Sequence, residues 1–275
     1  MKSLLYLLLF VSVNVFGEQR IITLSPSINE IVFALGSGDD IVANTQFSNF
    51  PQKSKKIAKV GGYSSVSLEK ILLAKPSVIL AQNYDQKLIK NIKKLNLNIH
   101  TFKTDNLQSI KSTIKQIGKL LHKVKQADIL REDINKALKS IENIISNKKI
   151  LVVISPREDL NKTIFVAGNN LYFNDIIEQS GNTNAYFSSS LSQPMVNIEK
   201  IIKMNPDIII MLAPYMHQNG ISYDKLQKNW LDLPINAAKQ KKIYIVDKEY
   251  AGIPSHRVVH FIEDFKDILV DVRDK

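Results

Sequence analysis

One pattern occurs twice in the chain, as SLEKILLAKPSVIL at residues 67–80 and as NIEKIIKMNPDIII at residues 197–210. Five of the fourteen positions are identical, and four others exchange one aliphatic residue for another. The copies lie too far apart for a solenoid, whose repeats are about 20 to 50 residues long. The repeat therefore predicts two related lobes.

Each copy predicts a short helix followed by a strand. A glutamate, Glu69 or Glu199, stands near the helix start, where the helix N-terminus favours negative charge. A proline, Pro76 or Pro206, ends the helix because it lacks a backbone donor. The branched aliphatic run that follows is typical of a strand buried on both faces. The pattern predicts an α/β fold of two lobes, each a parallel sheet flanked by helices.

The first 17 residues predict a secretory signal peptide. They contain one lysine and a run of apolar residues, and they end on Gly17. The apolar run is too short to favour a membrane-spanning helix, although a buried first helix or a membrane anchor is the alternative. We therefore expect export to the periplasm. Because the sequence has no cysteine, we expect no lipid anchor, no disulfide bond and no thiol metal site.

The net charge of +11 comes from 37 lysines and arginines against 26 acidic residues. The lysines are scattered along the chain, which is typical of a solvated surface. Proteins that bind nucleic acid more often cluster basic residues on one face. We therefore expect no nucleic-acid partner, while an anionic ligand or membrane surface stays as an alternative.

The chain divides into an N-terminal lobe at residues 18–122, a bridging helix at residues 123–147 and a C-terminal lobe at residues 148–275. The bridging segment contains neither proline nor glycine, and its apolar residues lie three or four positions apart. A single helix of this length would extend about 37 Å. In each lobe we expect the ligand at the carboxyl ends of the parallel strands.

Five motifs follow one another along the chain after the signal. They are RIITLSPSINEIVFALG (20–36), VGGYSSVSLEKILLAKPSVIL (60–80), AGNNLYFNDIIEQSGNTNAY (167–186), QPMVNIEKIIKMNPDIII (193–210) and IPSHR (253–257). With these motifs the chain resembles the helical-backbone class, class III, of periplasmic substrate-binding proteins of ABC importers. That class delivers cobalamin, iron-siderophores and haem. Within it, the chain is most similar to cobalamin-binding members and their relatives of unassigned ligand.

The resemblance implies two lobes joined by one long helix, with the ligand between the lobes and a joint that bends little. It also implies that one glutamate on each lobe docks into arginines of the membrane permease, and the matching residues are Glu69 and Glu199. On the residues alone, each is equally well a carboxylate in a first helical turn. We expect a monomer without a cofactor, whose partners are a metal-chelate ligand and the permease of an ABC importer.

The loops that match the ligand-binding walls of the class carry aromatic residues and an arginine, which suit a large, flat ligand. The predicted ligand contacts are Phe47, Phe50, Tyr63, Tyr84, Tyr172, Tyr186, Tyr250 and Arg257. Taken singly, any of these aromatic residues would more often pack in the core or at its rim than contact a ligand.

The ligand itself is less well specified. Cobalamin binders of the class resemble one another in tryptophans at the places of Tyr63, Gln82 and Gln193, and this chain has none there. Its single tryptophan, Trp230, follows the second copy of the repeat, where we expect it to pack. Haem binders of the class carry an iron-ligating tyrosine at the place of Tyr63, and a phenolate suits ferric iron. We expect cobalamin or a ferric siderophore, with haem bound through Tyr63 as an alternative.

Histidines leave a further alternative, the capture of nickel or another metal chelate. His256 and His260 are four positions apart and could share a helix face, and His217 lies in a predicted loop. The rival from another class is a periplasmic hydrolase. The sequence contains no GxSxG, HExxH or phosphate-binding loop motif, so we expect a binding protein and not an enzyme.

Overall fold

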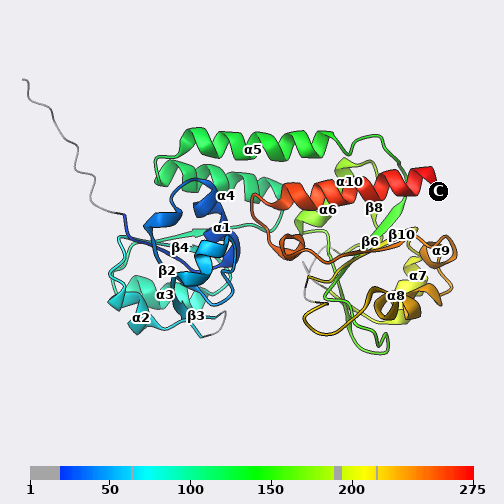
Figure 1. Cartoon of the computed structure of the whole chain (residues 1–275), viewed down its shortest axis with the longest axis horizontal. Helices are drawn as coiled ribbons and strands as arrows, with labels where there is room; N and C mark the ends of the chain where they lie inside the picture. The colour runs from blue at the N-terminus through cyan, green and yellow to red at the C-terminus, as the bar shows by residue number, and fades with distance from the viewer. Residues whose placement is uncertain (1–18, 63–64, 189–193, 215) are drawn as a thin grey trace, which may run out of the picture.

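The computed structural model describes residues 19–62, 65–188, 194–214 and 216–275. Two lobes lie side by side, with helices α4 (Leu107–Leu120), α5 (Val124–Lys139) and α10 (Val258–Asp274) along one edge (Figure 1). This arrangement confirms the two-lobed α/β fold predicted from the repeat. The predicted signal peptide lies outside the described residues.

The N-terminal lobe is built on five parallel strands in the order β3-β2-β1-β4-β5. They are β1 (Ile21–Thr23), β2 (Ile41–Thr45), β3 (Ala58–Gly61), β4 (Val78–Gln82) and β5 (Ile99–Phe102). Strand β1 is buried along its whole length, as its aliphatic sequence predicts. The sheet is therefore covered on both faces.

Four helices cover this sheet, two on each face. Helices α1 (Pro26–Ala34) and α4 pack their isoleucines against one face. Helices α2 (Leu68–Leu73) and α3 (Gln86–Lys94) place Ile71 and Ile92 against the other. Helix α1 begins as expected, because the Ser25 hydroxyl accepts a hydrogen bond from the Ile28 amide at 3.2 Å and a proline stands in the first turn.

The C-terminal lobe contains a sheet in the order β11-β10-β6-β7-β9, with β8 paired to β6. Its strands are β6 (Lys149–Ile154), β7 (Ile164–Val166), β8 (Thr183–Asn184), β9 (Met195–Val196), β10 (Ile208–Leu212) and β11 (Ile243–Val246). Strands β10, β11, β6 and β8 pair in parallel, whereas β7 pairs with both β6 and β9 in antiparallel fashion. This sheet is mixed because only a short loop separates β6 from β7, too short for the crossover that a parallel neighbour needs.

The helices of the C-terminal lobe are α6 (Tyr172–Gln179), α7 (Ile198–Met204), α8 (Tyr223–Leu231), α9 (Asn236–Lys239) and α10. The second copy of the repeat forms α7 and β10, as the first copy forms α2 and β4. Three short 3-10 turns complete the described chain: η1 (Gly38–Asp40), η2 (Gln52–Lys56) and η3 (Glu249–Gly252). Trp230 is completely buried, in agreement with its expected packing role.

The connecting helix is shorter than its sequence predicts. Helix α5 ends at Lys139, and turns follow where the prediction extended the helix to residue 147. Asn143 and Asn147 adopt left-handed backbone angles, with φ of 60° and 59°. Asparagine tolerates this conformation better than most residues, and an α-helix cannot contain it.

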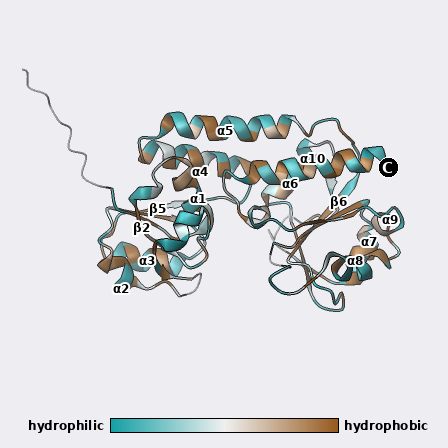
Figure 2. Ribbon diagram, viewed as in Figure 1, coloured by the Kyte–Doolittle hydropathy of each residue, from teal (hydrophilic) through white to brown (hydrophobic). Residues whose placement is uncertain are grey.

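One hydrophobic core runs through both lobes. It joins Ile21 of the first sheet and Ile150 of the second through Ile134 on α5 and Phe265 on α10. Bands of hydrophobic and hydrophilic residues alternate along α5 and α10 in Figure 2, as expected for helices with one buried face. The lobes are therefore packed onto a shared layer of helices.

Candidate ligand-binding and docking sites

The loop after β2 meets the C-terminal lobe through Phe50. The Arg257 guanidinium carbon lies 3.7 Å from the centre of the Phe50 ring and 5.5 Å from that of Tyr250. Arg257 precedes α10, and Tyr250 belongs to the turn that follows β11. The carboxyl ends of strands from both sheets thus come together at this point, where ligands of α/β folds bind.

Arg257 is a structural link between the lobes and is 7% exposed. Its Nη1 donates a hydrogen bond to Glu30 Oε1 at 2.9 Å, and Ser255 Oγ donates to Glu30 Oε2 at 2.5 Å. Glu30 stands on α1, so this buried pair joins the first helix of one lobe to the last helix of the other. The guanidinium is thereby occupied by Glu30 and by the Phe50 ring, and it positions Phe50.

Burial changes the electrostatics of Glu30. Loss of water raises the pKa of Glu30 to about 7, although the hydrogen bonds from Ser255 and Arg257 and the charge of Arg257 all act to lower it. Tyr172 lies nearby, and burial with a smaller effect of Glu30 raises the pKa of its phenol far above the usual range. The junction between the lobes thus contains a carboxyl group that titrates near neutrality.

A buried network of polar side chains holds the loop that carries Phe47 and Phe50. Asn29 Nδ2 donates to the Phe50 carbonyl at 3.0 Å and to Ser54 Oγ at 2.9 Å. Asn44 Nδ2 donates to Asn29 Oδ1 at 3.1 Å and also to Ser54 Oγ at 2.9 Å. All three polar residues are completely buried. Satisfied networks of this kind fix a local structure, so the loop is held in one conformation.

Three predicted contact residues present their rings at strand ends of the first sheet. Phe47 is 48% exposed, Phe50 is 40% exposed and Tyr84 is 51% exposed. Large aromatic side chains are usually much more buried than this in a folded domain. Tyr63 follows the same strand-end region but lies outside the described residues.

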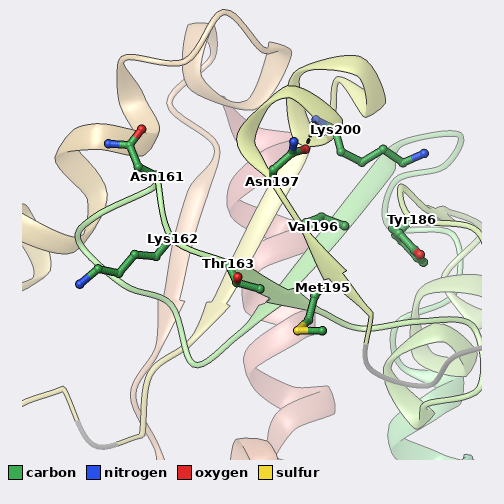
Figure 3. A pocket seen from close by; sticks show the side chains of 8 residues that line it. All are labelled: Asn161, Lys162, Thr163, Tyr186, Met195, Val196, Asn197 and Lys200. Atoms are coloured by element: carbon green, nitrogen blue, oxygen red, sulfur yellow. Dashed lines mark hydrogen bonds between the residues drawn. The ribbon is translucent and has the colours of Figure 1, made fainter.

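The other predicted aromatic contacts are placed differently. Tyr172 is 3% exposed, and its hydroxyl donates to the Ala251 carbonyl at 2.7 Å, so it belongs to the core. Tyr250 is half-buried, and its hydroxyl donates to Asp264 Oδ2 at 2.8 Å. Tyr186 lines a hollow beside α7, and Phe50 is not among the residues that line this hollow (Figure 3). The structure therefore brings together Phe50, Tyr250 and Arg257 but not the whole predicted set.

Of the two histidines expected to share a helix face, only His260 lies on α10. His256 precedes α10, which begins at Val258, and burial lowers the pKa of His256 to about 4. His260 Nδ1 lies 3.1 Å from Glu263 Oε2. Among the described residues, no group of three or more histidine or acidic side chains is arranged to hold a metal ion.

His217 belongs to a separate cluster at the ends of β10 and β11. Its Nε2 lies 3.0 Å from Asp247 Oδ2, and the Tyr223 hydroxyl donates to the same oxygen at 2.5 Å. The hydrogen bond from Tyr223, followed by those from His217 and Lys248, lowers the pKa of Asp247 to about 2. The imidazole is therefore oriented by an ionised carboxylate while its ring stays exposed.

The two predicted docking glutamates occupy equivalent positions in the two lobes. Glu69 lies in the first turn of α2 and Glu199 in the first turn of α7, and both are exposed. Each helix is capped in the same way, because Ser67 Oγ accepts from the Lys70 amide at 3.2 Å and Asn197 Oδ1 accepts from the Lys200 amide at 3.0 Å. The sequence repeat is thus also a structural repeat.

A hollow of about 560 Å³ lies beside the first turn of α7. It is lined by Asn161, Lys162, Thr163, Tyr186, Met195, Val196, Asn197 and Lys200 (Figure 3). The Lys162 and Lys200 side chains extend to either side of it in the view. This hollow adjoins the helix of Glu199, and Phe50 is not among the residues that line it.

Sequence reasoning missed Glu30, Asn29 and Asn44. The first two interrupt an otherwise apolar segment of α1, and Asn44 interrupts an apolar strand. Polar residues at positions that the hydrophobic period assigns to the core are a signal for a buried network, because an unpaired polar group there is costly.

The described residues contain no helix with both the length and the apolar character that a membrane crossing needs.

The chain is 25% identical over 279 residues to the vitamin B12-binding protein of Vibrio vulnificus (strain CMCP6), covering 100% of this chain and 99% of that protein. It is 27% identical over 259 residues to the uncharacterized ABC transporter substrate-binding lipoprotein YvrC of Bacillus subtilis (strain 168), covering 90% of this chain and 78% of that protein.

Comparison with solved structures supports the same fold. The crystal structure of the periplasmic vitamin B12-binding protein of Vibrio cholerae matches with a TM-score of 0.78 and 20% sequence identity, covering 94% of this chain and 98% of that chain. The sequence family described as periplasmic binding protein matches residues 21–250. The chain is therefore a member of the periplasmic binding protein family.

Proposed function

We propose that the chain captures a metal chelate between its two lobes and delivers it to the permease of an ABC importer. The proposed ligand is cobalamin or a ferric siderophore. Family membership supports the carrier role, and relatives along the full length are named for vitamin B12 binding. The observation that carries the ligand class is the exposure of Phe47, Phe50 and Tyr84 on strand ends that are otherwise well packed.

The supporting geometry is a pre-organised aromatic surface. Arg257 covers one face of the Phe50 ring and the asparagine network fixes its backbone, so little freedom is lost when a ligand stacks on the other face. Tyr84 and Phe47 supply further aromatic area. Tyr250 is half-buried beside Arg257, whereas the burial of Tyr172 argues for a supporting role instead of direct contact.

An absorbance titration tests the ligand class. Protein of residues 18–275 is titrated with cyanocobalamin, haemin and ferric siderophores, with calorimetry as the second readout. We expect saturable binding of a corrinoid or a ferric siderophore, and Phe50→Ala should weaken it about tenfold or more through loss of stacking. Leu231→Ala on α8 is the control. Saturable binding of none of these compounds would overturn the proposed ligand class.

Haem is the alternative ligand, with Tyr63 as the iron ligand. Haemin would then give a tyrosinate-type absorption band that Tyr63→Phe abolishes. Retention of the band in this variant would remove the assignment.

The His217 cluster favours a second candidate, a chelate whose metal has a coordination position open to the protein. Metal-binding histidines commonly have the other ring nitrogen bonded to a carboxylate, as His217 has with Asp247. A nickel–histidine chelate is the probe for calorimetry. His217→Ala should abolish its binding while His260→Ala leaves it unchanged; equal binding by all three proteins would exclude this candidate.

We further propose that Glu69 and Glu199 dock into the permease. Exchange of both for alanine should abolish ligand uptake by cells while ligand affinity of the purified protein stays the same. Normal uptake in the double variant would remove the docking role.

We also propose export by the signal at residues 1–17, a free and unanchored monomer, and a role without catalysis. The absence of cysteine supports the lack of a lipid anchor, since the sequence offers no thiol for attachment. N-terminal sequencing of the periplasmic protein should begin at residue 18. Mass spectrometry should recover the bound ligand chemically unchanged, and a converted product would contradict the carrier role.

A further inference from the structure

Helix α2 carries two neighbouring leucines on the outside of the molecule. Leu72 is 46% exposed and Leu73 is 72% exposed, whereas Ile71 between the helix and the sheet is completely buried. Single exposed leucines are common on protein surfaces, but adjacent ones form a continuous apolar area. The helix thus has one face that anchors it and another whose apolar side chains are left in water.

These leucines lie on the same helix face as the proposed docking glutamate. Glu69, Leu72 and Leu73 are spaced i, i+3 and i+4, and side chains at this spacing are neighbours on a helix surface. All three are exposed. We name this set the α2 docking face.

The second copy of the repeat does not carry the apolar pair. Glu199 matches Glu69, but Ile202 is only half-exposed and Lys203 stands where the first copy has Leu73. The hollow next to α7 is also bordered by lysines. The two lobes therefore share the glutamate and the lysine that follows it, and they differ in the apolar pair, which is exposed only on the N-terminal lobe.

We propose that the α2 docking face is an apolar contact with the importer permease, in which Leu72 and Leu73 bury themselves beside the residue that binds Glu69. This inference rests on the proposed function, since the partner is the permease of that function. The inference adds that the permease contacts the two lobes through different chemistry. The permease surface over α2 then has an apolar groove next to the basic group that binds Glu69.

A second copy of the chain is a less suitable occupant. Each copy carries a net charge of +11, so two copies repel one another. The ligand is also a poor occupant, because α2 runs from the carboxyl end of β3 toward the start of β4. Its last residues, Leu72 and Leu73, therefore lie toward the edge of the sheet away from the strand-end loops.

Photo-crosslinking in cells of the source bacterium tests the partner directly. Benzoylphenylalanine is placed at position 73, and in a matched control at position 129 on α5, where Ile129 is 51% exposed. We expect the probe at position 73, and not the one at 129, to crosslink to the ABC permease subunit, identified by mass spectrometry. A crosslink to a second copy of the chain, or none at all, would overturn the proposal.

Uptake of radiolabelled ligand gives the second arm. Leu72→Gln with Leu73→Gln should weaken the apparent affinity for the importer about tenfold per leucine, whereas Ile129→Gln should not. Leu73→Lys, which copies the residue of the second lobe, should by itself lower affinity about tenfold. Unchanged uptake in the double variant would refute the apolar contact.

Ligand titration separates this inference from the proposed function. The leucine variants should bind ligand as tightly as the unchanged chain, because Leu72 and Leu73 lie at the end of α2 that leads into the start of β4, whereas Phe50 lies in the loop after the carboxyl end of β2. If no chelate binds any form, the proposed function fails, yet the crosslink at position 73 still reports the partner. A different result would refute only the α2 contact. In that case the chain binds ligand, the exchange of Glu69 and Glu199 abolishes uptake, and the leucine variants take up ligand as well as the unchanged chain.

Discussion

The side chains of Glu30 and Arg257 carry the most consequential single contact of the molecule. Both are nearly inaccessible to water, and they belong to different lobes. Removing one partner of a buried ion pair leaves the other charge without compensation, so Arg257→Ala should lower the free energy of unfolding by about 3–5 kcal/mol. Urea unfolding followed by circular dichroism measures the loss.

The matched control for Arg257 is Arg131→Ala. Arg131 pairs with Asp128 on α5 at 2.9 Å in an exposed ion pair, which contributes about 0–1 kcal/mol. A loss of less than about 1 kcal/mol for Arg257→Ala would show that the pair is not needed to join the lobes.

Glu30 also predicts a dependence of stability on pH. Its pKa is raised by burial to about 7 from an ordinary value of 4.5, so the folded chain binds this proton more tightly than the unfolded chain. The associated stability is complete below about pH 4.5 and is lost as pH rises through 7, by about 3 kcal/mol in total. Thermal unfolding of the parent chain and Glu30→Gln is compared from pH 5 to 8.5.

In the variant Glu30→Gln, the contribution of Glu30 to the pH dependence of stability should be absent. The contributions of the other titrating groups should remain. The contribution of His256 to the pH dependence of stability has the opposite sign, because its lowered pKa makes stability rise with pH between about 4 and 6.5. The difference between the two profiles therefore isolates Glu30, and identical profiles would contradict the raised pKa.

At the scale of residues, the sequence predicted the position of aromatic side chains better than their orientation. Phe47, Phe50 and Tyr84 lie exposed at strand ends, as expected. Tyr172 has the same chemistry and a matching loop position, but its ring points into the core. Arg257 was predicted as a ligand contact, and its guanidinium is bonded to Glu30, 227 residues away along the chain. Such a partner cannot be found from local pattern.

Helices α4 and α5 are in close contact at Gly118, and this contact predicts the effect of one methyl group. A Cβ at Gly118 would overlap the Cβ of Ala127 on α5. Gly118→Ala should therefore destabilise the chain by about 1–3 kcal/mol, even though alanine favours an isolated helix by about 1 kcal/mol over glycine. Chemical unfolding measures the change.

Gly252 provides the comparison for Gly118. No atom lies within 4 Å of the Cβ that alanine would add there. Gly252→Ala should leave stability nearly unchanged. If Gly118→Ala were instead stabilising, helix propensity would outweigh the contact between α4 and α5.

At the scale of elements, the repeat located two helix–strand units correctly, because proline and aliphatic runs act locally. The predicted end of α5 was wrong by eight residues. Neither glycine nor proline marks the observed end, and the asparagines that turn the chain there are also found inside helices. The prediction of a parallel sheet in each lobe is wrong for β7, which pairs with β6 in antiparallel fashion, because the direction of a strand depends on its neighbour and not on its own sequence.

We expect the whole molecule to be stiff for a protein with two lobes. One buried core passes from the first sheet through α5 and α10 to the second. Two backbone amides add direct links, since Tyr172 N donates to the Asp105 carbonyl at 2.7 Å and Leu107 N donates to Asp175 Oδ2 at 2.6 Å. Opening the joint would expose part of this core and break these bonds together, so we expect a single arrangement of the lobes.

Distances between spin labels can test this stiffness cleanly, because the chain has no cysteine of its own. Cysteines placed at Lys87 on α3 and Lys228 on α8 carry one exposed label on each lobe. We expect a narrow distance distribution that shifts by less than about 2 Å when ligand is added, as for partners that bind without rearrangement. A broad distribution in the free protein, or a larger shift on binding, would mean that the Glu30–Arg257 link opens and that capture occurs by closure. In the Arg257→Ala background the distribution should broaden even without ligand, because the lobes then lose their buried ion pair while the helices still connect them.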